Sequence, residues 1–196
     1  MVAKKKKKTV DKWKRKKWFK IVAPKLFNEL VIGETPAEKE AQAMNRVVEA
    51  SLADLTGQRK FRHITVRLRI TNITNDKAIT RTIGCKVDNS YLKRMVRRRR
   101  TKVENVTVVE TADKNKVKVS AVTICGTRVE KAKEKAVRKA MGEVISAEAK
   151  KAKFDIFMQQ LMFGNISTKI FNSIKNIAPI QRVEIVKANL LEEAKR

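Results

Sequence analysis

Residues 61–71, FRHITVRLRIT, alternate between apolar and polar side chains, and this pattern leaves the segment few ways to fold. The apolar positions lie two residues apart: Ile64, Val66, Leu68 and Ile70. Successive side chains of a strand point to opposite faces, so the pattern predicts a strand with one buried face and one basic face. Asn75 and Asp76 favour a turn, and ITRTIGCKV after them alternates again. Its predicted buried positions are Ile79, Ile83, Cys85 and Val87. The two segments predict a β-hairpin.

A second hairpin and a long helix are predicted further along the chain. VENVTVVE and KVKVSAVTIC, joined by TADKNK, have the alternation of paired strands. Thr127 and Glu130 have the spacing of a capping box, which predicts a helix that runs to about Lys150. Helical periodicity predicts the residues on its core-facing side to be Val129, Ala132, Ala136, Ala140 and Val144.

The C-terminal segments add two helices and a strand. FDIFMQQLMF predicts a helix that ends at Gly164, and STKIFNSIKNI predicts a short helix capped by Asn165 or Ser167. QRVEIVKAN predicts the last strand. Hairpins followed by helices indicate an α+β fold. We expect a mainly antiparallel sheet of hairpins, with a barrel-like sheet as one option, packed with several helices and preceded by a basic N-terminal arm.

The N-terminal third is harder to interpret. About half of residues 1–20 are lysine or arginine, so this arm is predicted to be disordered alone, and residues 21–196 are predicted to form a single α+β domain. Thr35 and Pro36 suit the N-cap and first position of a helix over AEKEAQAM. RVVEASLADL fits either a helix or a strand, and we favour a strand from Arg46.

Between the two predicted hairpins, a short helix that carries Tyr91 and Met95 on one side is predicted after a cap at one of Asp88, Asn89 or Ser90.

Charge decides which partners suit this chain. Lysine and arginine total 47 against 20 acidic residues, for a formal net charge of +27 and an isoelectric point near 10.5. Such a chain is expected to bind a polyanion: RNA first, DNA second and an anionic membrane surface third. No apolar run approaches the roughly 18–20 residues of a membrane span. The basic N-terminus lacks the apolar region of a signal peptide. We therefore expect a cytoplasmic protein.

The residues that usually carry catalysis are sparse. No glycine-rich phosphate loop is present. Cys85 and Cys125 fall in phase with apolar neighbours, which predicts that both are small buried residues. The single histidine, His63, has no predicted nucleophile or orienting partner and is expected at an exposed or rim position. The sequence predicts no enzyme, no metal site and no cofactor.

Three basic clusters remain as candidates for binding: the arm, residues 93–102, and the back of the helix after residue 127. Lysine neutralises phosphates, whereas arginine also binds phosphate with two parallel hydrogen bonds and stacks on bases. Trp13 and Trp18 could stack on bases, and the alternative for Trp18 is that it packs with Phe19 against the protein's own core. The predicted RNA-binding residues are Lys4, Lys5, Lys6, Lys7, Lys8, Lys12, Trp13, Lys14, Arg15, Lys16, Lys17, Trp18, Lys20, Arg62, Lys93, Arg94, Arg97, Arg98, Arg99, Arg100, Lys102, Arg128, Lys131, Lys135 and Arg138.

Several long phrases resemble one protein family: KKWFKIVAP, RVVEASLADL, GCKVDNSYLKRMVRRR, VKVSAVTICGTR and IQRVEIVKANLL. Nearly end to end, the chain resembles the S-three-A-e family of small-subunit ribosomal proteins (eukaryotic-type S-one) in its archaeal form. The resemblance implies a structural component that binds ribosomal RNA on the platform near the messenger exit and supports translation. It implies neighbouring platform proteins as partners, messenger RNA as a further option, and neither a membrane nor a small-molecule substrate. It also implies a strand at RVVEASLADL and no catalytic residues.

A different class of function competes with this one. A free nucleic-acid-processing or chromatin-like factor would have a similar charge, but it would bind DNA or RNA transiently. Salt separates the two classes, because affinity that depends on many phosphate contacts falls steeply as salt rises.

Overall fold

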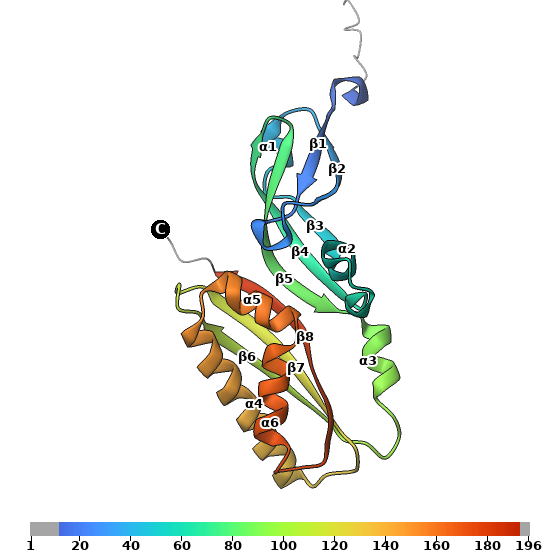
Figure 1. Cartoon of the computed structure of the whole chain (residues 1–196), viewed down its shortest axis with the longest axis vertical. Helices are drawn as coiled ribbons and strands as arrows, with labels where there is room; N and C mark the ends of the chain where they lie inside the picture. The colour runs from blue at the N-terminus through green and yellow to red at the C-terminus, as the bar shows by residue number, and fades with distance from the viewer. Residues whose placement is uncertain (1–11, 193–196) are drawn as a thin grey trace, which may run out of the picture. The chain divides into compact units, whose positions relative to one another are not determined.

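The computed structural model describes residues 12–192, which form two compact units (Figure 1). The described part of the N-terminal unit contains residues 12–46 and the segment Arg69–Arg81. The described part of the C-terminal unit contains Val47–Leu68 and residues 82–192. The strands follow the order β2-β1-β5-β8-β7-β6, with β4 paired to both β3 and β5. The predicted α+β class with a mainly antiparallel sheet is confirmed, and over the described residues the sheet is open at β2 and β6, so it is not a barrel.

The N-terminal unit is built on two antiparallel strands, β1 (Lys17–Val22) and β2 (Val31–Ala37). β1 also pairs in parallel with the start of β5, from Lys20 opposite Lys77 to Val22 opposite Ile79. Short helical turns accompany these strands: η1 (Lys12–Arg15), η2 (Lys25–Phe27) and α1 (Glu40–Ala43). A small core fills the unit, and its buried side chains are Phe19, Ala37, Ala43, Ile70 and Ala78.

The predicted disorder of the arm is wrong for its described part, because Lys12–Arg15 form η1 and β1 begins at Lys17. Phe19 is buried while Trp18 and Lys20 point outward, so the alternation typical of a strand is hidden among the lysines. The Lys20 amide donates a 2.8 Å hydrogen bond to the Asp76 carbonyl oxygen. Residues 1–11 lie outside the described part of the chain, so the division into an arm and one domain stays a prediction.

Thr35 and Pro36 lie in strand β2, and the predicted helix start at this place is wrong. The reason is a tertiary partner. Arg46 donates hydrogen bonds of 2.8 Å to the hydroxyl oxygen of Thr35 and of 2.9 Å to the carbonyl oxygen of Pro36. A proline is tolerated here because β2 is an edge strand, where one row of backbone groups has no neighbouring strand among the described residues. Of the helix predicted over AEKEAQAM, only the four residues of α1 are helical.

The first predicted hairpin is confirmed as β4 (Ile64–Thr74) and β5 (Lys77–Val87). The turn residues Asn75 and Asp76 both have positive φ angles, 49° and 60°, as in the turns that suit two-residue hairpins. The predicted inward face of β5 is wrong at Ile79, which is 43% exposed. Thr80 is buried instead, and its hydroxyl donates a 2.8 Å hydrogen bond to the Val22 carbonyl oxygen of the neighbouring strand β1.

The C-terminal unit contains the second predicted hairpin and the predicted last strand, both confirmed: β6 (Lys102–Glu110), β7 (Lys116–Cys125) and β8 (Ile180–Glu192). β7 lies between β6 and β8 and is antiparallel to both. β8 in turn pairs with β5 over three residues, with Gly84 opposite Asn189. Three helices lie together against one face of these strands (Figure 1): α4 (Lys131–Lys151), α5 (Phe154–Met162) and α6 (Asn165–Ile174).

The structure corrects two predictions about helix starts and one about a helix face. No side chain of the described residues caps α4, whose N-cap is Glu130, so the capping box from Thr127 is not formed. Gly164, with φ 81°, is the N-cap of α6 in place of Asn165 or Ser167. The buried stripe of α4 is one position further round than predicted: Val137, Met141, Ile145 and Ala149. This stripe carries larger apolar side chains, which cover more of the sheet than the predicted alanines would.

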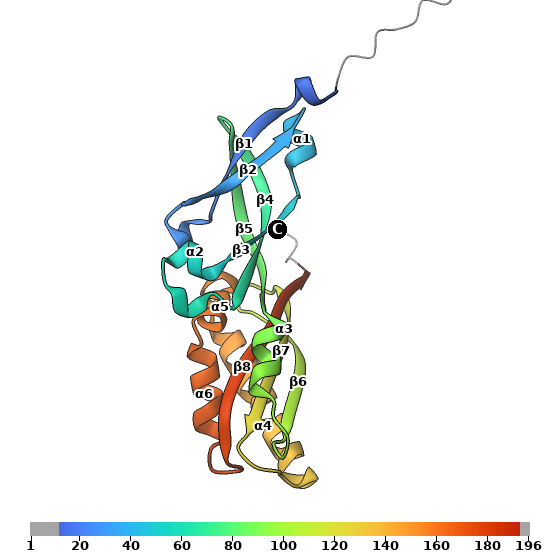
Figure 2. The same cartoon turned by 90° about the vertical axis from the view of Figure 1, so that its right-hand side faces the viewer.

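The remaining elements of the C-terminal unit precede β6: β3 (Val47–Ser51), α2 (Leu52–Thr56), η3 (Arg59–Phe61) and α3 (Asn89–Met95). The strand expected in RVVEASLADL is confirmed for its first half. It ends where the Ser51 side chain caps α2 by accepting a 3.3 Å hydrogen bond from the Ala53 amide. Asp88 caps α3 as predicted. α3 lies on the side of the sheet away from α6 (Figure 2).

Candidate nucleic-acid interface

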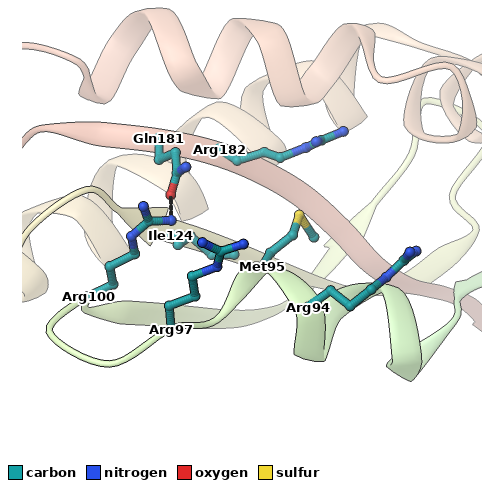
Figure 3. A pocket seen from close by; sticks show the side chains of 7 residues that line it. All are labelled: Arg94, Met95, Arg97, Arg100, Ile124, Gln181 and Arg182. Atoms are coloured by element: carbon teal, nitrogen blue, oxygen red, sulfur yellow. Dashed lines mark hydrogen bonds between the residues drawn. The ribbon is translucent and has the colours of Figure 1, made fainter.

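A basic pocket of about 250 Å³ lies in the C-terminal unit, between α3 and the ends of strands β7 and β8 (Figure 3). The strand register explains which side chains reach it. Thr123 points to the helical face, where its hydroxyl donates a 3.2 Å hydrogen bond to the Met141 sulfur. Ile124, the next residue, therefore points to the opposite face, and it pairs across the strands with Arg182. The pocket is lined by Arg94, Met95, Arg97, Arg100, Ile124, Gln181 and Arg182.

The loop between α3 and β6 brings two of these arginines to the pocket. α3 ends at Met95, and Arg99 adopts a positive φ of 64°, which turns the chain back toward the sheet. The loop is fixed at its far end, because the Cys125 amide donates a 2.9 Å hydrogen bond to the Thr101 carbonyl oxygen. Arg97 and Arg100 extend from this loop toward Ile124 and Gln181 (Figure 3).

Positive charge in the pocket is only partly compensated. Among the described residues, four arginines line it and no carboxylate does. Arg100 donates a hydrogen bond to the side-chain oxygen of Gln181, which is neutral. Arg182 donates a 2.7 Å bond to the Glu184 carboxylate, which lies outside the lining. Arg97 has no hydrogen bond or ion pair within residues 12–192. The pocket therefore has guanidinium groups available for an anion.

An aromatic pair lies beside the pocket and holds its rim. The rings of His63 and Tyr91 stack with centroids 4.0 Å apart. The guanidinium carbons of Arg182 and Arg94 lie 5.5 Å and 5.8 Å from the Tyr91 ring centroid, within cation–π range. Partial burial, followed by the nearby Glu184, raises the pKa of Tyr91, so its hydroxyl remains protonated and donates a 3.4 Å hydrogen bond to that carboxylate.

The same surroundings make His63 sensitive to acid. Partial burial is the largest effect on this histidine and lowers its pKa; Arg182 and Arg94 act in the same direction, while Glu184 and the backbone of Lys60 oppose them. The folded unit therefore binds a proton at His63 less readily than the unfolded chain does. The free energy of unfolding should then fall as the pH drops below the unfolded pKa of about 6.5, and it should lose nothing above that value.

We expect a His63→Phe variant, which keeps the ring stack but cannot titrate, to lose this part of the pH dependence. Urea unfolding of both proteins between about pH 7.5 and pH 5.5 measures it, because most carboxylates stay ionised over that range. Parallel curves for the two proteins over this range would contradict the assignment.

The basic residues predicted to bind RNA fall into separate groups. Of those in the arm, Lys4 to Lys8 lie outside the described residues, and Lys12 begins η1. The others in the arm are exposed: Trp13, Lys14, Arg15, Lys16, Lys17, Trp18 and Lys20. Trp18 does not pack with Phe19 in the core. It makes an edge-to-face contact with Trp13 at 6.4 Å, and the Lys16 ammonium lies 4.2 Å above the Trp13 ring.

In the C-terminal unit the pocket gathers Arg94, Arg97 and Arg100 and leaves the other predicted residues outside its lining. Those others are exposed: Arg62, Lys93, Arg98, Arg99, Lys102, Arg128, Lys131, Lys135 and Arg138. Two of them have partners within the protein. The Arg138 side chain donates a 3.0 Å hydrogen bond to the Glu104 carbonyl oxygen, and Lys102 forms an ion pair with the Glu104 carboxylate. That these residues bind RNA stays a prediction.

Sequence reasoning missed Gln181 and Arg182, which lie in β8 far along the chain from α3. The pattern of this segment indicates a strand and nothing more. A signal was present, because Arg182 and Glu184 alternate with the buried residues Val183 and Ile185. The alternation places Arg182 on the face opposite the buried side chains, but it does not show that α3 covers this face. The partner element could be identified only from the fold.

Other chemistries find little support in the described residues. Both cysteines are free and buried, as predicted, and burial raises the pKa of the Cys85 thiol to about 12. Such a thiol remains protonated and is a poor nucleophile. Residues 12–192 contain no group of three or more His, Cys, Asp and Glu side chains that could hold a metal ion. Within the same residues, no helix has both the length and the apolar character needed to cross a membrane.

Comparison with known proteins identifies the family of the chain. A profile of the Ribosomal S3Ae family matches residues 4–194. The chain belongs to the Ribosomal S3Ae family. The small ribosomal subunit protein eS1 of Sulfurisphaera tokodaii is 37% identical to it, over 93% of this chain and 94% of its own length. The eS1 proteins of Saccharolobus islandicus and Saccharolobus solfataricus are 36% and 34% identical, over 93% of this chain and 88% of theirs.

Membership of the S3Ae family confirms the predicted resemblance, including its archaeal character. It makes the chain a ribosomal protein of the small subunit and not an enzyme.

Proposed function

We propose that this S3Ae protein binds ribosomal RNA on the platform of the small subunit, near the messenger exit, and supports translation as a structural component. The observation that carries the RNA contact is the pocket, which within residues 12–192 is lined by four arginines and no carboxylate. Charge-assisted hydrogen bonds from arginine to phosphate are about twice as strong as neutral ones. The net charge of +27 extends the same preference for a polyanion to the whole chain.

The other partners of the proposal come from the family resemblance. Neighbouring platform proteins and messenger RNA near the exit are the proposed further contacts. The exposed face of η1 and β1 supports a second RNA contact, since Trp13 and Trp18 are 58% and 55% exposed beside lysines. Aromatic rings among cations suit RNA because bases stack on the rings while the cations neutralise phosphates.

The transient-binder alternative is tested by salt. Tagged protein in a lysate of a native source is sedimented through a gradient at low salt and again at high salt. We expect the protein to migrate with the small subunit at both, because many cooperative contacts must break together before it leaves. Migration with the subunit at low salt alone would favour a transient factor, since purely electrostatic binding weakens steeply with salt. Migration away from the subunit at both would contradict the proposal.

A further inference from the structure

The pocket has the features of a site for one small anionic group with an apolar part. Its volume of about 250 Å³ is below the roughly 300–1,000 Å³ of pockets for drug-sized ligands. Three kinds of group line it: the guanidiniums of four arginines, the side-chain amide of Gln181, and the apolar side chains of Met95 and Ile124. A bare inorganic anion would need only the first kind. A paired RNA backbone would present only phosphate and sugar to the pocket and would leave the amide and the apolar side chains without a partner.

We propose that the pocket binds a single unpaired nucleotide of an RNA chain, with its phosphate on Arg97 and Arg100 and its base against Met95, above the floor that the buried Ile124 forms. This inference rests on the proposed function and makes it more specific. Unpaired nucleotides in loops and bulges can be turned out of the helix, and proteins read them by stacking on flat groups and by hydrogen bonds to base edges. Gln181 can both donate and accept such hydrogen bonds.

Contacts within the unit assign different roles to the arginines. Arg182 is held by the 2.7 Å bond to Glu184 and by its position over Tyr91, and Arg94 also lies over that ring. Arg182 is therefore positioned as a fixed wall, with Arg94 beside it, and their planar guanidiniums offer a surface for stacking. Arg100 bonds to a neutral amide and Arg97 to no described residue, so both can turn to a phosphate without breaking an ion pair.

The test changes the charge of the pocket at one position and compares it with the same change elsewhere. Gln181→Glu converts the neutral partner of Arg100 into a carboxylate, which would compete with a phosphate for that guanidinium. Gln159→Glu makes the identical change at an exposed position of α5 and gives the same net charge. The full chain is titrated with a short RNA hairpin that carries one bulged nucleotide, and with the same hairpin without the bulge.

We expect the unmodified protein and Gln159→Glu to prefer the bulged hairpin, and Gln181→Glu to reduce that preference about tenfold, as expected when a charge-assisted hydrogen bond is removed. Equal affinity of the unmodified protein for both hairpins would overturn the pocket assignment and leave general RNA binding intact. Equal effects of Gln181→Glu and Gln159→Glu on the preference for the bulged hairpin would also overturn the pocket assignment. Failure to bind either hairpin, together with migration away from the small subunit, would contradict the proposed function itself.

Competition experiments distinguish an RNA nucleotide from other ligands that carry a phosphate group. Free nucleoside monophosphate should displace the bulged hairpin only weakly, because it lacks the flanking chain that the rest of the basic surface binds. Displacement by a serine-phosphorylated peptide at the concentration at which RNA itself competes would overturn the inference in favour of a protein ligand.

Discussion

Replacing Gly84 by alanine should lower the free energy of unfolding of the C-terminal unit by about 3 kcal/mol, the upper end of the usual cost of overpacking. Gly84 lies in β5 opposite Asn189 of β8, where the two strands pair over only three residues. A Cβ atom placed on Gly84 would lie 2.5 Å from the Ala188 carbonyl oxygen and 2.9 Å from the Asn189 side-chain oxygen.

The cost is high because the obstacle is backbone. A side chain that meets the end of a flexible neighbour can push it aside, but the Ala188 oxygen moves only if β8 moves. Displacing β8 disturbs β7 as well, since β7 pairs with β8 along almost its whole length. The side-chain oxygen of Asn189, the second obstacle, is buried without a hydrogen-bond partner among the described residues.

Gly126→Ala is the matched control in the same unit. Its added Cβ would meet nothing among the described residues closer than the Pro179 carbonyl oxygen at 3.7 Å, an ordinary contact. We expect this variant to remain within about 0.5 kcal/mol of the unmodified protein in urea unfolding. Equal stability of the two variants would show that the β5–β8 contact is looser than the structure describes.

The sequence predicted the elements with a strong alternating pattern and did less well where a tertiary partner decides. Both hairpins and the last strand are correct, because the period of two is evident in their own residues. Thr35 and Pro36 look like a helix start, but their pairing with β1 and the hydrogen bonds from Arg46 fix them in β2. Local propensity could not include those contacts.

The buried face of α4 shows a second limit of prediction from sequence. Two stripes of apolar residues recur at helical spacing along this helix, one containing Ala132 and Ala136 and the other Val137 and Met141. Periodicity alone does not choose between neighbouring stripes. The stripe with larger side chains packs against the sheet, because these side chains fill the space above Thr123 and its neighbours.

The sequence predicted only the part of the candidate site that lies in one continuous segment. The arginine run after α3 stands out in the sequence, and its placement at a surface loop follows from composition. Arg182 and Gln181 come to the same pocket only because β7 pairs with β8 in the observed register. A register between segments so far apart is a property of the whole sheet, so the concave form of the site could not be derived from either segment alone.

Replacing Arg97, Arg98, Arg99 and Arg100 together by glutamine should weaken binding to purified small-subunit ribosomal RNA by about 100-fold at physiological salt. The loop that carries these residues is exposed except at Arg100, and its anchoring at Thr101 uses backbone groups that glutamine leaves unchanged. The fold should therefore survive, and the free energy of unfolding should change little. The dependence of affinity on salt should become shallower by about one for each phosphate that the variant no longer neutralises.

A matched variant separates position from total charge. Lys133, Lys150, Lys153 and Lys175 are exposed and lie outside the predicted RNA-binding residues. Replacing these four by glutamine removes the same charge from the C-terminal unit. If the arginine loop is a contact surface, its variant should bind RNA much more weakly than the lysine variant, and it should enter assembled subunits less well. Equal affinities of the two variants would mean that RNA responds to the total charge of the chain, because long-range attraction depends on the sum of charges while contacts depend on where they are.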